Sequence, residues 1–145
     1  MTQRLRVKSR TSPYQMFRYL REHNPSPFGG FFQYGDYQII CASPERFLKI
    51  HDRVVETRPI KGTRRRGNDV AEDETLRLEL EHSEKDKSEL LMIVDLERND
   101  FNRVCETGSV KVTEHFTVET YATVFHLVSK YCWEAAGKGN GDGCH

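Results

Sequence analysis

The residues of this sequence that are best suited to chemistry form a basic stretch in its first half. Arg58, Lys61 and the arginines at 64–66 place five cationic side chains within nine positions. Lys61 directly precedes Gly62 and Thr63, so a long amine lies beside backbone that a ligand can approach closely. Such a stretch can bind a carboxylate or phosphate. It can equally be a solvated basic loop, and the stretch alone does not decide between these interpretations.

Two acidic residues suggest a different chemistry, the binding of a hard metal ion. Asp86 and Glu89 lie three positions apart in a predicted helix, so both carboxylates can face the same way. The positive end of the helix dipole favours acids there, and Mg²⁺ prefers oxygen ligands. Two structural alternatives stay open: Asp86 can cap the helix, and Glu89 can form an internal ion pair with Arg98 or another arginine.

Glu45 and His126 are single candidates elsewhere in the chain. Glu45 lies at the junction of two predicted strands, where an isolated acid is most simply a solvent-exposed residue. His126 lies between Val124 and Val128 in an apolar strand, where a histidine is either a core residue or a proton-transfer group. Neither residue identifies a site by itself.

Composition limits the classes of protein to which the chain can belong. Its 145 residues suit one domain, and 37% hydrophobic with 30% charged residues are typical of a globular cytoplasmic protein. A formal net charge of zero argues against a nucleic-acid partner. No apolar run is long enough to span a membrane, and the first residues do not resemble a secretory signal. The four cysteines lack zinc-ligand spacing, so we expect free thiols.

The pattern of apolar and turn residues predicts an α+β fold with an antiparallel sheet and packed helices. The expected elements are a helix over 12–23, strands over 28–34, 37–43, 46–50 and 53–56, helices over 69–82 and from residue 83, and strands over 109–113, 116–121 and 123–129. Pro59 lacks an amide hydrogen and should end the strand before it or lie at an edge. The helix segment from Leu90 is apolar on every side, which predicts burial. Residues 131–145 are expected to be a disordered or non-homologous tail after a domain over 1–130.

Several motifs, taken in order, resemble those of the chorismate-utilising enzymes. They are Ala42–Phe47 (ASPERF), Arg58–Arg64 (RPIKGTR), Lys85–Glu89 (KDKSE), Met92–Asp100 (MIVDLERND), Gly108–Val112 (GSVKV) and His126–Ser129 (HLVS). The family includes component I of anthranilate synthase and of aminodeoxychorismate synthase, isochorismate synthase and salicylate synthase. The likeness covers about residues 12–129, and several collinear motifs are more specific than any one alone. It implies a partial chorismate-binding domain, similar to anthranilate synthase component I.

Position 61 distinguishes branches of this family. Anthranilate synthases typically have alanine in Pro-Ile-Ala-Gly-Thr, whereas aminodeoxychorismate synthases typically have lysine, as here. The resemblance therefore implies conversion of chorismate and ammonia to 4-amino-4-deoxychorismate, on the p-aminobenzoate route to folate. Anthranilate synthase component I, on the route to tryptophan, is the enzymatic alternative. A non-catalytic anion-binding module that uses the arginines at 64–66 is the alternative from another class.

The resemblance also assigns roles in the reaction itself. Lys61 matches a lysine that adds at ring C2 as the C4 hydroxyl departs, after which ammonia adds at C4 and expels the lysine. An amine attacks as the free base, and Arg58 and Arg64 are the cations that would favour this form. Glu45 matches the acid that protonates the leaving hydroxyl.

The remaining candidates would bind the substrate and its metal. Glu89 matches a glutamate that holds Mg²⁺ on the ring carboxylate, with Asp86 beside it. Substrate-contacting positions of the family match Gly62, Thr63 and His126. Ammonia would come from a glutamine amidotransferase partner, because nothing in this sequence resembles a glutaminase.

The family's catalytic unit is longer than this chain. The sequence lacks the family's N-terminal portion and, beyond residue 130, its Thr-Gly-Ala-Pro-Lys motif, its substrate-clamping arginine and its second metal-binding glutamate. We therefore expect the chain alone to be inactive and of low stability, because its central strands would lack partners.

Overall fold

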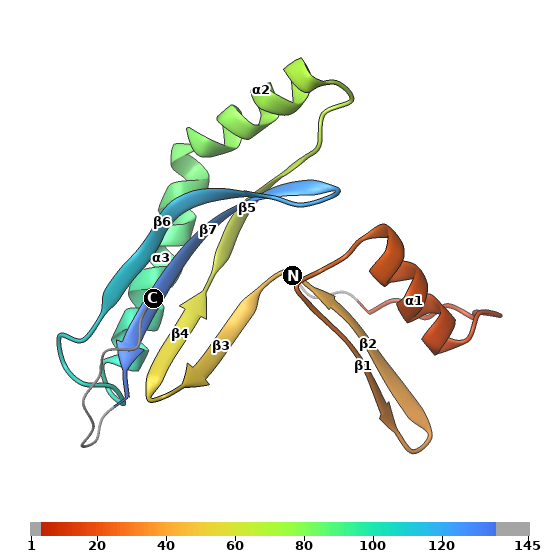
Figure 1. Cartoon of the computed structure of the whole chain (residues 1–145), viewed down its shortest axis with the longest axis horizontal. Helices are drawn as coiled ribbons and strands as arrows, with labels where there is room; N and C mark the ends of the chain where they lie inside the picture. Colours follow the sequence, from red (N-terminus) through yellow and green to blue (C-terminus); the bar gives the residue numbers. More distant parts are fainter. Residues whose placement is uncertain (1–3, 136–145) are drawn as a thin grey trace. The chain divides into compact units, whose positions relative to one another are not determined.

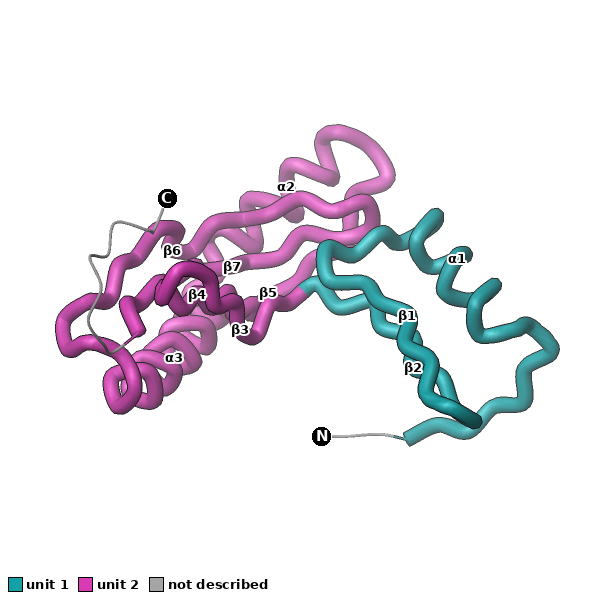
Figure 2. Tube along the Cα trace, turned by 60° about the horizontal axis from the view of Figure 1, so that its bottom comes forward, with its two compact units in different colours: residues 1–44 teal, residues 45–145 magenta. Residues whose placement is uncertain are grey.

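The computed structural model describes residues 4–135. These residues form two compact units, whose boundary lies between Pro44 and Glu45 (Figure 2). The predicted domain over residues 1–130 contains the first unit and most of the second. The first contains α1 (Pro13–His23), β1 (Phe28–Tyr34) and β2 (Tyr37–Ser43). The second contains β3 (Arg46–His51), β4 (Val54–Arg58), β5 (Ile60–Arg65), α2 (Val70–Glu81), α3 (Glu84–Phe101), β6 (Lys111–Thr120) and β7 (Val124–Glu134).

Local turn and cap chemistry explains the first unit, whose elements match the prediction. Ser12 caps α1 through a capping box, in which Ser12 and Gln15 each accept the other's backbone N–H at 3.3 Å. Strands β1 and β2 form an antiparallel hairpin in which Tyr34 pairs with Tyr37. Gly35 adopts a φ of +48° in the turn, a conformation that glycine reaches without strain.

The second unit is a five-stranded antiparallel sheet organised around β7 (Figure 1). Strands β4 and β5 pair with successive halves of β7, at Tyr131–Glu134 and Val124–Val128, while β6 pairs with the same residues from the other edge. Strand β3 extends the sheet beyond β4. This confirms the prediction that the strand beginning near residue 123 is central.

The basic stretch is a strand and not a loop. Pro59 interrupts the ladder between β4 and β5, but its carbonyl accepts the backbone N–H of Ser129 at 3.3 Å, and pairing resumes at Ile60. Pro59 is itself fully buried. The expectation that the strand before Pro59 ends is confirmed, because β4 stops at Arg58. The interpretation of the basic stretch as a loop is wrong, because β7 supplies hydrogen-bonding partners for β5 that lie far away in the sequence.

Helices α2 and α3 pack on one face of this sheet. The core consists of alternate residues of β7, packed with Val55 and with three residues of the helices. The β7 residues are Phe125, Leu127, Tyr131 and Trp133, and the helix residues are Leu80, Leu90 and Val94. However, Leu91, Met92 and Leu96 are 51%, 65% and 59% exposed. The prediction that α3 is buried on every side is therefore wrong, because only one stripe of the helix meets the sheet.

The ordered chain also continues further than predicted. Strand β7 runs to Glu134, and Trp133 is only 1% exposed, so residues 131–135 are part of the core and not a tail. The rest of the predicted tail lies outside the described residues. Cys41 and Cys105 are free thiols, but Cys132 is disulfide-bonded, which corrects the expectation for that residue. No helix within residues 4–135 is long and apolar enough to cross a membrane.

Candidate functional site

A bulge in β5 shapes the backbone beside Lys61. The pairing register with β7 shifts between Ile60 and Thr63, and Gly62 within this bulge has a φ of +79°. A Cβ atom at Gly62 would lie 2.8 Å from the Asp86 Cβ and from the Leu80 Cδ1. Gly62 therefore allows β5 to approach the two helices closely. Close packing is therefore a sufficient reason for glycine at this position, and a substrate contact is not needed to explain it.

Thr63 and His126 come together across the β5–β7 pair. They are directly opposite in register, and the Thr63 hydroxyl lies 2.9 Å from His126 Nδ1. The ring of Tyr121 packs edge-on against the imidazole of His126, with the two ring centroids 5.3 Å apart. Burial lowers the pKa of His126, while the negative charge of Glu45 opposes this shift. A neutral imidazole is therefore favoured, and it can hydrogen-bond a ligand without adding charge.

Glu45 is joined to the same region by a backbone contact. Its Oε1 accepts the N–H of Ile60 at 2.9 Å, which holds the acid at the start of β5. Its charge acts on both His126 and Glu97, and the charge of half-buried Lys61 also acts on Glu97. The structure therefore brings Lys61, Glu45 and His126, which are distant in the sequence, into one cluster.

Glu97 is the member of this cluster that the sequence analysis did not single out. It lies on α3 seven positions after Leu90 and three after Val94, the two buried residues of that helix. This spacing puts an acid on the apolar stripe and was a signal available from sequence alone. Burial raises the pKa of Glu97, contact with the Thr57 hydroxyl and the charge of Lys61 oppose the rise, and the charge of Glu45 adds to it.

The two predicted metal ligands do not assemble a metal site. Asp86 Oδ2 accepts hydrogen bonds from the Ser83 hydroxyl at 2.7 Å and from Arg64 at 3.2 Å, so capping and ion pairing occupy it. The Glu89 side chain is 49% exposed, with a single long contact of 3.9 Å to Lys85. Among residues 4–135 no three His, Cys, Asp or Glu side chains are placed to share a metal ion. The pairing of Asp86 with Glu89 is therefore not supported, and neither is a pairing of Glu89 with Arg98.

The arginines of the basic stretch are neutralised by acids of the helices. Arg64 contacts Glu79 at 2.8 Å and Asp86 at 3.2 Å. Arg65 pairs with Glu72, and Arg66 binds both oxygens of Asp73 at 2.8 and 2.6 Å. These internal pairs contradict the interpretation of residues 64–66 as an anion-binding surface.

Ion pairing also corrects the predicted surroundings of Lys61. Arg58 pairs with Glu119 on β6, so neither Arg58 nor Arg64 is an uncompensated cation that could favour the neutral amine. The charges of Lys61 and Glu45 instead both act on the carboxyl of Glu97, whose pKa Lys61 lowers and Glu45 raises. Sequence shows the cations together, but their acidic partners come from other elements.

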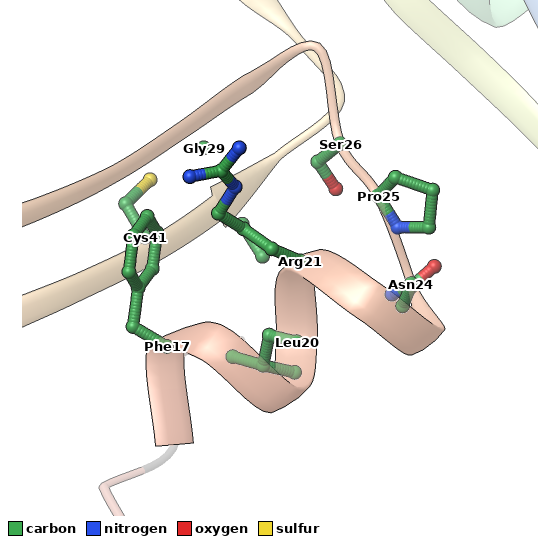
Figure 3. Close-up of a pocket in the computed structure, with 9 residues that line it drawn as sticks. Phe17, Leu20, Arg21, Asn24, Pro25, Ser26, Gly29 and Cys41 are labelled. Carbon is green, nitrogen blue, oxygen red and sulfur yellow. The ribbon is translucent and has the colours of Figure 1, made fainter. Parts of the chain in front are cut away.

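A separate cavity lies in the first unit, between α1 and the β1–β2 hairpin (Figure 3). It has a volume of about 240 Å³, and Phe17, Arg21 and Cys41 are among the residues that line it. None of the catalytic, substrate-binding or metal-binding candidates from the sequence lines this cavity. It is therefore distinct from the Lys61 cluster.

Comparison with known proteins agrees with the sequence motifs. The family model for chorismate binding enzymes matches residues 1–130. Aminodeoxychorismate synthase component 1 of Bacillus subtilis (strain 168) is 50% identical over 117 residues, which are 81% of this chain and 25% of that protein. Anthranilate synthase component 1 of Cereibacter sphaeroides is 44% identical over 135 residues, 93% of this chain and 27% of that protein.

A solved structure supports the fold. The crystal structure of anthranilate synthase component I from Streptococcus pneumoniae TIGR4 matches with a TM-score of 0.74 at 39% identity, over 86% of this chain and 27% of that one. The chain spans about a quarter of the length of these relatives. The predicted α+β, partial chorismate-binding domain is thus confirmed, and relatives of two activities match it. The chain belongs to the family of chorismate binding enzymes.

Proposed function

We propose that the chain is the chorismate-binding portion of an aminodeoxychorismate synthase component I. The observation that carries this proposal is the lysine at position 61, which lies at the bulge of β5 in one cluster with Glu45 and His126. An amine is a nucleophile that alanine at this position would not provide. The relative from Bacillus subtilis that is named for this activity supports the assignment.

The proposed reaction replaces the C4 hydroxyl of chorismate by an amino group. The Lys61 amine forms a bond to ring C2, the ring double bond shifts, and the C4–O bond breaks as the hydroxyl takes a proton and leaves as water. Ammonia then forms a bond to C4, and the bond between Lys61 and C2 breaks. The sum is chorismate plus ammonia giving 4-amino-4-deoxychorismate plus water. We propose a glutamine amidotransferase partner as the source of ammonia.

Each residue of the cluster has a task in this proposal. Glu45 delivers the proton to the leaving hydroxyl. His126, held by Thr63 and favoured in its neutral form, hydrogen-bonds the substrate. Glu89 is the one acid that we propose for Mg²⁺, because Asp86 is committed to Arg64 and Ser83. When bound, Mg²⁺ would supply positive charge for a substrate carboxylate.

The experiment uses the full reading frame that contains this sequence, incubated with chorismate, ammonium and Mg²⁺. Chromatography should identify 4-amino-4-deoxychorismate, and Lys61→Ala should abolish it, whereas Lys111→Ala, at an exposed position of β6, should not. Glu89→Gln should raise the Mg²⁺ concentration needed for half-maximal rate, and Asp86→Asn should not. The 145-residue chain alone should give no turnover. Anthranilate as the direct product would instead assign anthranilate synthase component I.

A further inference from the structure

His126 is buried in the middle of the sheet, with a polar neighbour on the strand at each side. It is 9% exposed and lies directly opposite Thr63 on β5 and Glu119 on β6. Residues that are directly opposite in neighbouring strands point to the same face of a sheet, so these three side chains share a face. The Thr63 hydroxyl lies 2.9 Å from His126 Nδ1. Nδ1 is therefore turned toward β5, and Nε2 is the ring nitrogen that a ligand can use.

Tyr121, which lies between β6 and β7, packs its ring against this imidazole. The two ring centroids are 5.3 Å apart and the ring planes meet at 64°, an edge-on arrangement that aromatic pairs prefer. The hydrogen bond to Thr63 holds the imidazole at one nitrogen and does not by itself fix the plane of the ring. The contact with Tyr121 restricts rotation of that plane. Thr63 and Tyr121 together therefore define the direction in which Nε2 points.

Tyr121 is itself held at both its backbone and its hydroxyl. Its N–H donates to the carbonyl of Val124 at 2.9 Å, and its carbonyl accepts a hydrogen bond from Arg66 at 2.9 Å. Its hydroxyl donates to Oε2 of Glu119 at 2.7 Å. The other carboxylate oxygen of Glu119, Oε1, pairs with Arg58 on β4, and the side chains of this pair are both largely buried. The tyrosine ring cannot turn away from the imidazole without breaking these contacts.

We propose that Tyr121 is a positioning residue of this site, which holds the imidazole of His126 so that Nε2 is presented to the substrate. Glu119, with its partner Arg58, acts through Tyr121 by fixing the tyrosine hydroxyl. An imidazole that is already oriented loses little rotational freedom when a ligand binds, so the binding energy is not spent on ordering it. The inference rests on the proposed function for the identity of the substrate, whereas the orientation of His126 is a property of the chain itself.

The first test is ¹⁵N NMR of the 145-residue chain labelled at histidine, at a pH where the imidazole is neutral, with His126→Gln to assign the signals. A hydrogen bond at Nδ1 favours one tautomer, so the two ring nitrogens of His126 should resonate far apart. Thr63→Val and Tyr121→Leu should each bring these resonances closer together. Tyr37→Leu, at an exposed tyrosine of β2, should leave them unchanged. If Tyr121→Leu lowers stability but leaves the His126 resonances as in wild type, Tyr121 is only structural and the proposal is overturned.

A second measurement covers the case in which Tyr121→Leu fails to fold. Tyr121→Phe keeps the ring and removes only the hydrogen bond to Glu119. In the full reading frame it should raise the KM for chorismate roughly 2- to 10-fold, as expected for one lost hydrogen bond, with a smaller effect on kcat. It should have no further effect on KM in a His126→Ala background, because it acts through the imidazole. An unchanged KM, or effects of the two substitutions that add, would overturn the proposal. If the full reading frame does not turn over chorismate, the proposed function fails, and the NMR result still decides the role of Tyr121.

Discussion

At the scale of single residues, the type of a side chain does not identify its role until its contacts are known. Asp86 has the chemistry of a metal ligand, but Ser83 and Arg64 occupy its carboxylate. Glu97 has the position of a core residue, and the charges of Lys61 and Glu45 act on its carboxyl. Sequence predicted the first acid as part of a site and passed over the second. The difference lies in contacts between elements, which spacing along one helix does not contain.

Gly62 gives a prediction at this scale, with Gly108 as a matched control. Both have positive φ, +79° and +80°, but a Cβ at Gly108 meets nothing within 4 Å, whereas one at Gly62 meets Asp86 and Leu80 at 2.8 Å. Gly108→Ala should cost about 1–2 kcal/mol for the left-handed conformation. Gly62→Ala should cost roughly a further 1–3 kcal/mol for overpacking. Urea denaturation of both variants measures the difference, and equal costs would contradict close packing at the bulge.

At the scale of elements, a set of arginine–acid contacts joins β5 to the helices. Arg64 and Arg66 reach acids on α2, and Arg66 also lies over the ring of Phe125 at 4.8 Å. A Cβ on Gly67 would come within 2.2 Å of the Asp73 backbone nitrogen, so the chain runs close to α2 here. The helix prediction itself was accurate, because caps and periodicity are local signals. The sequence did not predict β5 as a strand. Most of its residues are polar, and it is pairing with β7 that makes this segment a strand.

Asp73 provides the prediction for this contact. Hydrogen bonds from the Arg66 guanidinium and then from the Gly67 N–H lower the pKa of Asp73 from 3.8 to about 2. Because folding depresses this pKa, the stabilisation is fully present above about 3.8 and is lost as pH falls toward 2. Asp73→Asn should therefore lower the melting temperature at pH 7, and the deficit should shrink below pH 4. Asp100→Asn, on the exposed face of α3, should show no such dependence. A deficit for Asp73→Asn that is constant down to pH 2 would contradict the ion pair.

At the scale of the whole molecule, sequence predicted the fold class and the order of the elements, apart from β5 and the joining of two expected strands in β6. It did not predict the division into two units or the exposed face of α3. Burial of a helix depends on what packs against each side, and the apolar pattern of α3 does not identify those neighbours. The end of β7 was missed for a related reason. Residues 131–134 have mixed polarity, and the β4 residues with which they pair lie far away in the sequence.

Trp133 tests whether this last part of β7 belongs to the core. It is 1% exposed, packs against Phe101 with ring centroids 4.6 Å apart, and pairs in register with Val55 on β4. Trp133→Ala should cost about 3–5 kcal/mol, because it removes a large buried side chain from close packing. Glu134→Ala, one residue later at the half-buried end of the strand, should cost far less. Chemical denaturation monitored by far-UV circular dichroism distinguishes the two. If both variants unfold at the same denaturant concentration as wild type, residues 131–134 form a tail, as the sequence pattern first indicated. If only Trp133→Ala unfolds early, the second unit requires the full length of β7.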